Sequence, residues 1–343
     1  MPSPHLAVRP EWLAQHSEPA LEPELAIIDA HHHLWDHANN PYRPADLLVD
    51  VAAGHRILAT VFAECSAWYR TDGPRALASL GETETVQAMA QAHTGACRIA
   101  AGIIGNVDLL LGAEAGAVLD AHLQAAPGRF KGIRNSSVYH PDPRARGSMA
   151  NPPPGLLLDS QFRLGLACLE PRGLSFDAWM YHTQLGDLMD LAQAFPGTSI
   201  VLNHVGGPLG IGPYAGQREA VFAEWKLSMR QLARCQNVSV KLGGMGMRLF
   251  GFDFASHNQP PDSQALATAW SPYVMACIEA FGPGRCMFES NFPVDKGTAS
   301  YGVVWNAFKR ITAALADDER KSLFSHTAAS VYRVDLTGTG DNQ

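Results

Sequence analysis

The residues best suited to chemistry stand together at the end of the first apolar run of the chain, in the sequence Asp29-Ala30-His31-His32-His33. Side chains alternate across a strand, so Asp29, His31 and His33 should share one face and His32 should point the other way. Two imidazoles at this spacing can bind one divalent metal ion. We therefore expect His31 and His33 to be metal ligands.

Two more histidines follow later apolar runs. His182 comes just after residues 174–180, and His204 directly follows residues 199–203 in the sequence LNHVGGP. A single histidine at a strand end is often structural, but together with the first pair these two suggest an active site. We expect His204 to take part in catalysis. For His182 the sequence leaves a functional and a structural role equally open.

Cationic and aromatic residues at strand ends could recognise a substrate. Arg134 and Lys241 each stand near the end of a short apolar run. Arginine is suited to bidentate carboxylate binding, so we expect contact with an acidic substrate, although either residue could instead form a salt bridge inside the fold. Trp68 and Trp179 are the aromatic residues expected to line an apolar pocket.

These residues need a scaffold that brings several strand ends together. Eight short strand-like runs alternate with segments of helical periodicity, which predicts parallel pairing and burial on both faces. The runs are 25–29, 57–64, 98–104, 130–134, 174–180, 199–203, 238–242 and 286–289. Eight such units predict an α/β fold of the (β/α)8 TIM-barrel type.

The expected domain organisation is simple. An N-terminal extension covers 1–24, a single barrel covers 25–337, and a short tail covers 338–343. The long segments 136–155 and 243–261 follow strands and should shape the substrate site.

The composition narrows the function further. With 343 residues and a net charge of −7, the chain shows no electrostatic footprint for nucleic acid. It has no GxGxxG, no P-loop and no GxSxG sequence, which argues against nucleotide binding and against acyl-enzyme chemistry. Six scattered cysteines, no apparent leader and no long apolar stretch indicate a cytoplasmic protein with reduced thiols and no membrane contact. The low charge content is compatible with a homodimer.

Three motifs carry a resemblance to a known family. They are the HxH sequence, LNHVGGP and the segment Glu289-Ser-Asn-Phe-Pro293. From about residue 25 to 334 the chain resembles the amidohydrolase superfamily, in particular its metal-dependent barrel branch of 2-pyrone-4,6-dicarboxylate lactonase, sugar lactonases and related decarboxylases. The resemblance implies that His31 and His33 are metal ligands, that His182 is a candidate third ligand, and that His204 is an acid/base or water-orienting group.

One position departs from that family pattern. Asn291 stands where the family has an Asp that takes a proton from the hydrolytic water. An amide is not basic near neutral pH, so the proton must go elsewhere. The candidates are Asp295, His204 and Glu64. Alternation also puts Glu289 on the same side as Asn291 and one layer deeper, either as a functional acid near the first strand or as a structural one.

The expected function is therefore metal-assisted hydrolysis of a small carboxylated lactone or related carboxylic derivative. The cofactor would be one divalent ion, zinc by expectation, with manganese or a metal-free site as alternatives. Two further functions stay open: a non-oxidative decarboxylase on the same barrel, and a barrel that binds a small acid without turnover.

Overall fold

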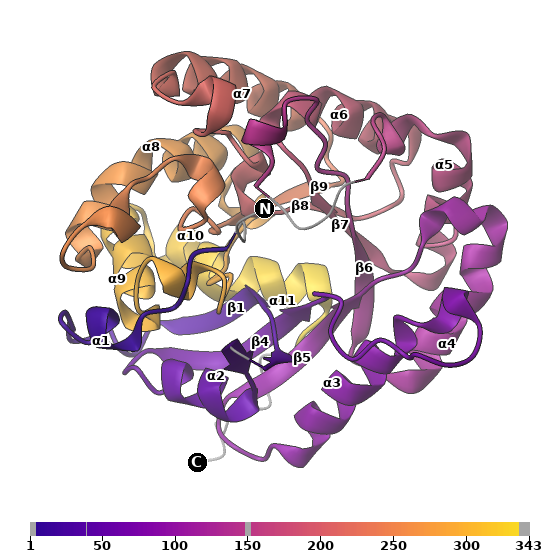
Figure 1. Cartoon of the computed structure of the whole chain (residues 1–343), viewed down its shortest axis with the longest axis horizontal. Coiled ribbons are helices and arrows are strands. Elements are labelled where there is room, and N and C mark those ends of the chain that lie inside the picture. Colours follow the sequence, from indigo (N-terminus) through magenta and orange to yellow (C-terminus); the bar gives the residue numbers. More distant parts are fainter. Residues whose placement is uncertain (1–4, 39, 148–151, 336–343) are drawn as a thin grey trace.

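A computed structural model describes residues 5–38, 40–147 and 152–335. Its centre is a sheet of eight parallel strands in the order β1-β4-β5-β6-β7-β8-β9-β10. Figure 1 views the molecule down its shortest axis, with the strands at the centre and the helices around them. The strands are β1 Ala26–His32, β4 Arg56–Ala63, β5 Arg98–Gly105, β6 Phe130–Ser136, β7 Ser175–Trp179, β8 Ile200–Leu202, β9 Val238–Leu242 and β10 Cys286–Phe288. Each of the eight expected runs forms one strand.

Helices follow the strands and surround them (Figure 1). They are α2 Pro44–Val51, α3 Leu80–Ala92, α4 Ala115–Ala125, α5 Ser160–Leu166, α6 Leu185–Ala194, α7 Arg218–Leu232, α8 Ser263–Phe281 and α9 Tyr301–Ile311, with the short α1 Pro10–Leu13, α10 Asp317–Lys321 and α11 Thr327–Tyr332. A two-stranded hairpin, β2 Trp35–His37 and β3 Asn40–Tyr42, follows β1. The protein is a (β/α)8 barrel, as the alternation of runs predicted.

The last strand closes the ring against the first. His32 and Phe292 form a parallel bridge, the N–H of Asn291 donates to the carbonyl of His31 (2.9 Å), and the N–H of His33 donates to the carbonyl of Phe292 (2.7 Å). This closure places the residues after β10 directly beside the histidines of β1.

The barrel has an apolar interior that is sealed at one end. Ile28, Val61 and Met287 pack with Tyr332 and Val334 from the C-terminal segment that contains α11. A second, larger apolar layer fills the space between strands and outer helices. Polar side chains inside the barrel must therefore find partners among themselves, because both layers exclude water.

A register shift in β1 overturns one expectation. Asp29 pairs with Thr60 but His32 pairs with Phe62, so three steps along β1 match two along β4. Such a bulge changes the alternation of side chains. The carboxylate of Asp29 accepts hydrogen bonds from the Ser290 hydroxyl (2.6 Å) and the Tyr301 hydroxyl (3.0 Å). The expectation that Asp29 shares the face of His31 and His33 is wrong.

His32 points away from the histidine group, as expected. Its ring contacts Phe62, and its Nε2 lies 2.8 Å from the Thr60 hydroxyl.

The N-terminal residues pack against the barrel. Glu18 accepts hydrogen bonds from the Ser263 N–H (2.7 Å) and from the Asn306 amide (3.0 Å), and Lys309 donates to the carbonyl of Leu21 (2.6 Å). These contacts tie the first segment to α8 and α9. The domain boundaries stay a prediction, and the expected tail 338–343 lies outside the described residues.

This anchor should make stability depend on pH. Burial raises the pKa of Glu18, but hydrogen bonds from Ser263, His16 and Asn306 together outweigh it and lower the pKa from 4.5 to about 2. The charged form is therefore favoured by folding, and its contribution is complete above pH 4.5 and lost as the pH falls toward 2. We expect Glu18→Gln to lower the free energy of unfolding by about 1 kcal/mol at pH 6, because water still screens this site. Urea unfolding at pH 6 and pH 3.5 checks this: the difference from wild type should shrink at the lower pH, and an equal difference at both would contradict it.

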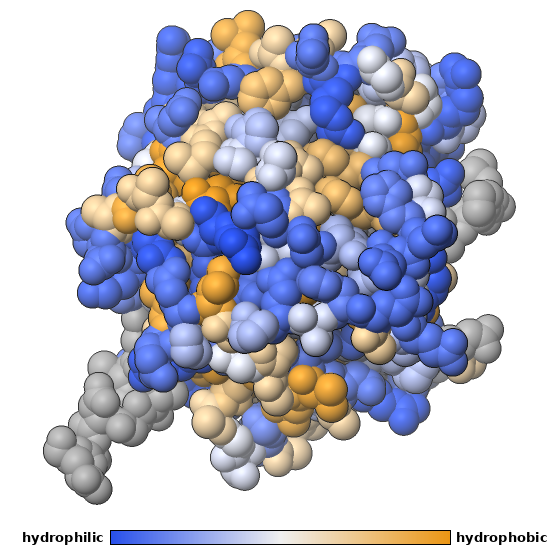
Figure 2. Space-filling model, turned by 90° about the vertical axis from the view of Figure 1, so that its left-hand side faces the viewer, coloured by the Kyte–Doolittle hydropathy of each residue, from blue (hydrophilic) through white to orange (hydrophobic). Residues whose placement is uncertain are grey.

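Three further features concern membrane-spanning helices, the cysteines and the hydropathy of the surface. No helix in the described ranges is long and apolar enough to cross a membrane. All six cysteines are unpaired, as expected. On the face that carries α1, α8 and α9, hydrophobic side chains form small groups between hydrophilic ones (Figure 2). A homodimer stays a prediction.

Candidate active site

Three imidazoles and a carboxylate meet at the carboxyl ends of β1, β8 and β10. His31, His204 and Glu289 each offer a ligand atom within 4.8 Å of the others. His33 joins them, with its Nε2 3.1 Å from Nε2 of His31. Glu289 binds Nδ1 of His204 at 2.7 Å and lies 3.2 Å from Nδ1 of His31. Four groups from three separate parts of the sequence therefore form one buried cluster.

Two consecutive glycines after β9 make room for this cluster. A Cβ at Gly243 would lie 2.4 Å from Cγ of Glu289, and a Cβ at Gly244 would lie 2.4 Å from Nδ1 of His204. His204 itself has a left-handed backbone, with φ of 51°. Such strain is characteristic of functional sites, where the surrounding structure holds a side chain in an unusual direction.

Burial sets the protonation of the cluster. It lowers the pKa of His31, His33 and His204 well below 6.5, with help from the nearby cations Lys241 and Arg134. The imidazoles are thus neutral at pH 7, the form that binds metals and accepts protons. Burial raises the pKa of Glu289 to about 8, although Lys241 opposes this shift.

Both predicted substrate-binding cations take part in ion pairs. Nε of Arg134 lies 2.9 Å from Oε1 of Glu64, and its Nη1 lies 3.3 Å from Nε2 of His31. Lys241 is completely buried and lies 2.7 Å from Oδ2 of Asp177 and 3.2 Å from Nδ1 of His31. For Lys241 the structure therefore shows the alternative of a salt bridge inside the barrel. Arg134 reaches the histidine group while Glu64 holds it in place.

Asn291 and Asp295 form a separate pair beside the cluster. The amide of Asn291 donates to Oδ1 of Asp295 (2.8 Å), and the N–H of Gly246 donates to Oδ2 (2.9 Å). Burial raises the pKa of Asp295 to about 8, against the effect of these hydrogen bonds. Asp295 thus fixes the orientation of Asn291.

The structure does not bring His182 into the histidine group. His182 starts a short 3-10 turn, three residues beyond β7. Its Nδ1 accepts the N–H of Leu209 (3.3 Å), and its ring packs edge-on against Tyr214. On this turn the His182 side chain contacts Leu209 and Tyr214 and not the other histidines of the cluster. The third imidazole of the cluster comes from His204 instead.

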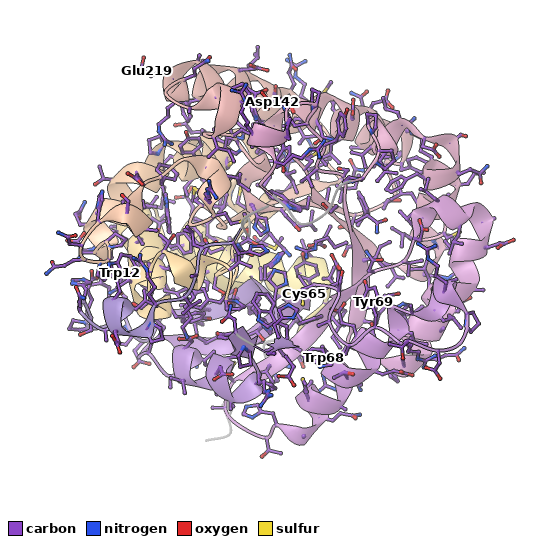
Figure 3. The ribbon with its side chains drawn as sticks, viewed as in Figure 1. Trp12, Cys65, Trp68, Tyr69, Asp142 and Glu219 are labelled. Carbon is purple, nitrogen blue, oxygen red and sulfur yellow. The ribbon has the colours of Figure 1, made fainter. Side chains whose placement is uncertain are left out.

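The two predicted tryptophans differ in position. Trp179 packs its ring edge-on against His204, with centroids 4.8 Å apart, and forms a wall of the site. Trp68 lies on the segment after β4, where Figure 3 shows it with Cys65 and Tyr69 between the middle of the barrel and α3. Buried Glu82 of α3 holds this segment by accepting the N–H groups of Cys65 (3.0 Å) and Ala67 (2.8 Å).

The donor set fits a divalent metal ion. Nδ1 of His33 lies 2.8 Å from the carbonyl of Ala63 and can donate to it, which leaves the lone pair of Nε2 free toward His31. Two imidazole nitrogens on one tetrahedral zinc ion lie about 3.3 Å apart, close to the observed 3.1 Å. Oε2 of Glu289 is buried without a hydrogen-bond partner. An imidazole–carboxylate set with an unsatisfied oxygen suits zinc or manganese.

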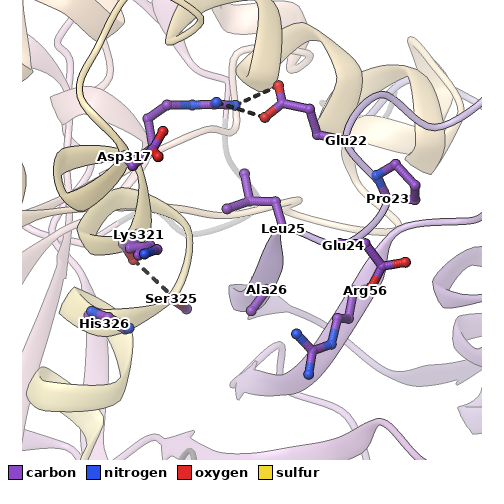
Figure 4. A pocket seen from close by; sticks show the side chains of 11 residues that line it. Glu22, Pro23, Glu24, Leu25, Ala26, Arg56, Asp317, Lys321, Ser325 and His326 are labelled. Atoms are coloured by element: carbon purple, nitrogen blue, oxygen red, sulfur yellow. Dashed lines mark hydrogen bonds and ion pairs between the residues drawn. The ribbon is translucent and has the colours of Figure 1, made fainter.

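A cavity of about 470 Å³ lies at the other end of the barrel (Figure 4). It is lined by residues just before or at the start of β1 and β4, such as Leu25 and Arg56, and by α10 and the turn after it. Barrel enzymes carry their active sites at the carboxyl ends of the strands, so this cavity is not the catalytic site.

A closed parallel barrel with imidazoles, carboxylates and cations at the carboxyl ends of its strands has the architecture of a barrel enzyme. The amidohydrolase family profile matches residues 28–334. The chain belongs to the amidohydrolase family and is a hydrolase, which confirms the resemblance seen in its motifs.

Individual relatives cover nearly the whole chain. An uncharacterized protein of Sinorhizobium fredii is 34% identical over 91% of this chain and 99% of its own length. L-fucono-1,5-lactonase of Burkholderia multivorans is 27% identical over 90% of this chain and 96% of its own.

Two solved structures share the fold. An amidohydrolase from Burkholderia multivorans with bound zinc has a TM-score of 0.70 at 23% identity, and covers 90% of this chain and 100% of its own. A 5-carboxyvanillate decarboxylase from Novosphingobium aromaticivorans with manganese has a TM-score of 0.56 at 12% identity, and covers 93% of this chain and 99% of its own.

Sequence reasoning missed two residues that hold the site. Asp177, the partner of Lys241, is the one acidic residue in the apolar run 174–180, and that contrast was an available signal. Glu82 lies in a helix that contains a second acidic residue, Glu84, so nothing local distinguishes it.

Proposed function

We propose that this protein is a lactonase that hydrolyses a small cyclic ester bearing a carboxylate. The proposal rests on the cluster of His31, His33, His204 and Glu289 beside the guanidinium of Arg134. The similarity to L-fucono-1,5-lactonase supports a lactone as the substrate class.

The residues of the cluster suit this reaction. In lactone hydrolysis the water oxygen bonds to the carbonyl carbon, the ring C–O bond breaks, and the ring oxygen receives a proton. His204 takes the proton of the water at Nε2 and returns it to the ring oxygen, since its Nδ1 is bound to Glu289. Glu289 orients the His204 ring through the hydrogen bond at Nδ1.

The neighbouring residues bind and orient. Arg134 holds the carboxylate of the substrate and is itself positioned by Glu64. Asp295 fixes Asn291, whose amide hydrogen-bonds the substrate or the water rather than acting as a base. Trp179, with Trp68 farther out, supplies the apolar wall against which the ring packs.

We assign one divalent ion, zinc by preference, to this site. His31 and His33 would hold it through imidazole nitrogens, and Glu289, whose Oε2 lies 3.2 Å from Nδ1 of His31, is the neighbouring acid. When bound, such an ion polarises a carbonyl and lowers the pKa of water.

The metal content of the purified protein tests this assignment. Protein prepared without chelator and without a His-tag resin should contain about one equivalent of zinc or manganese, as expected for one site of this ligand type. The double variant His31→Ala/His33→Ala should lose the metal, and His182→Ala, a matched control outside the cluster, should retain it. Absence of metal from the wild-type protein, or its retention in the double variant, would overturn the assignment.

Asn291 favours one second candidate, a non-oxidative decarboxylase. Hydrolysis needs a base that takes a proton from the water, and an amide at this position cannot be that base. Decarboxylation instead needs a proton donor, and burial raises the pKa of Asp295 next to Asn291 to about 8. A panel of carboxylated lactones and aromatic acids separates the two. Proton release without carbon dioxide indicates the lactonase, and carbon dioxide release indicates the decarboxylase. Binding without either product indicates a silent barrel.

A further inference from the structure

The first described residues of the chain lie over the mouth of the barrel. In Figure 1 the indigo chain runs from α1 at the edge of the molecule toward the centre of the barrel. Leu6 lies directly on the turn Asp295–Gly297, where a Cβ at Gly297 would be 2.6 Å from Cβ of Leu6 and 2.8 Å from its carbonyl oxygen. No side chain other than hydrogen would fit at Gly297 while Leu6 stays in place.

This segment is fastened at its outer end. Arg9 donates to the carbonyl of Ala255 (2.7 Å), and Nε1 of Trp12 donates to the carbonyl of His257 (3.0 Å). The Arg9 guanidinium also stacks on the Trp12 ring at 3.9 Å from its centroid. Both carbonyls belong to the long segment 243–261 that was expected to shape the substrate site.

The inner end of the segment reaches the turn Asp295–Gly297, beside the catalytic cluster. Gly297 is two residues beyond Asp295, which holds Asn291. Leu6, which packs on Gly297, therefore lies beside the turn that positions Asn291. The first described residues of the expected N-terminal extension therefore lie beside the site.

We propose that residues 5–13 form a fixed roof over the active site, and that Leu6 on Gly297 limits the size of the lactone that enters. This roof admits small carboxylated lactones and excludes those with bulky substituents. The size limit rests on the proposed lactonase function, whereas the covering of the cluster does not.

A Gly297→Ala variant should displace the roof. Gly297 has an ordinary backbone conformation, so the new methyl group acts through its clash with Leu6. Gly284→Ala is the matched control, because a Cβ at Gly284 meets nothing within 4 Å. A third variant lacks residues 1–9 and keeps Trp12.

The first readout needs no enzyme activity. Diethyl pyrocarbonate modifies histidines that it can reach, and peptide mass spectrometry follows the modification of His204, whose Nε2 is free of hydrogen bonds within the described residues. We expect it to proceed at least about fivefold faster in Gly297→Ala and in the truncated protein, since a lid that sequesters a site controls access to it. Gly284→Ala should match wild type. Equal rates in all four proteins, with circular dichroism showing that each is folded, would overturn the roof.

The second readout is selectivity among lactones. Displacing the roof should raise kcat/KM for a bulky lactone relative to a small one. Unchanged selectivity in a protein that hydrolyses lactones would overturn the size limit. If no lactone is hydrolysed but the modification rates rise, the proposed function fails and the roof stands.

Discussion

Replacing His204 with alanine should lower kcat for lactone hydrolysis by about 10²- to 10⁴-fold, the usual contribution of general acid–base catalysis. His204 is bound to Glu289 through Nδ1 at 2.7 Å and packs against Trp179, so its Nε2 is fixed in direction. Without the imidazole, no group in the described site takes its place directly, because Asp295 is bound to Asn291 and Glu64 is bound to Arg134. Steady-state proton release measures the loss.

Two controls make the His204 result specific. His326→Ala removes an exposed histidine at the other end of the barrel and should leave kcat unchanged. Added imidazole should restore part of the activity of His204→Ala, because it can enter the space left by the side chain. A loss of less than tenfold, or loss of the bound metal together with activity, would contradict the role of His204 as the proton carrier.

Replacing Lys241 with methionine should lower the free energy of unfolding by about 3–5 kcal/mol, the usual effect of removing one partner of a buried ion pair. Lys241 and Asp177 are both fully buried and lie 2.7 Å apart. Tyr332 and Asn203 also donate to Asp177, but they are neutral and cannot balance its charge. Urea unfolding at pH 7 measures the loss.

The double variant Asp177→Asn/Lys241→Met separates the ion pair from packing. It removes both charges, so it should lose less stability than Lys241→Met alone, and the double-mutant cycle should give a clear coupling energy. A double variant that is less stable than wild type by the sum of the two single-variant effects would show that the two charges do not interact.

The sequence by itself determined the barrel and much of the site. Eight apolar runs separated by amphipathic segments became eight strands and the helices around them, since local periodicity reports which faces are buried. The HxH sequence and LNHVGGP placed His31, His33 and His204 at strand ends, and these ends meet because all eight strands are parallel. Strand alternation also placed Glu289 near His31.

Only the tertiary structure decided how these residues meet. The bulge in β1 turns Asp29 toward Ser290, because register depends on hydrogen bonds with neighbouring strands and not on the sequence of one strand. Lys241 pairs with Asp177, 64 positions away, and Leu6 packs on Gly297 across most of the chain. Contacts between distant segments depend on the geometry of the closed barrel, and a local pattern of residue types does not encode that geometry.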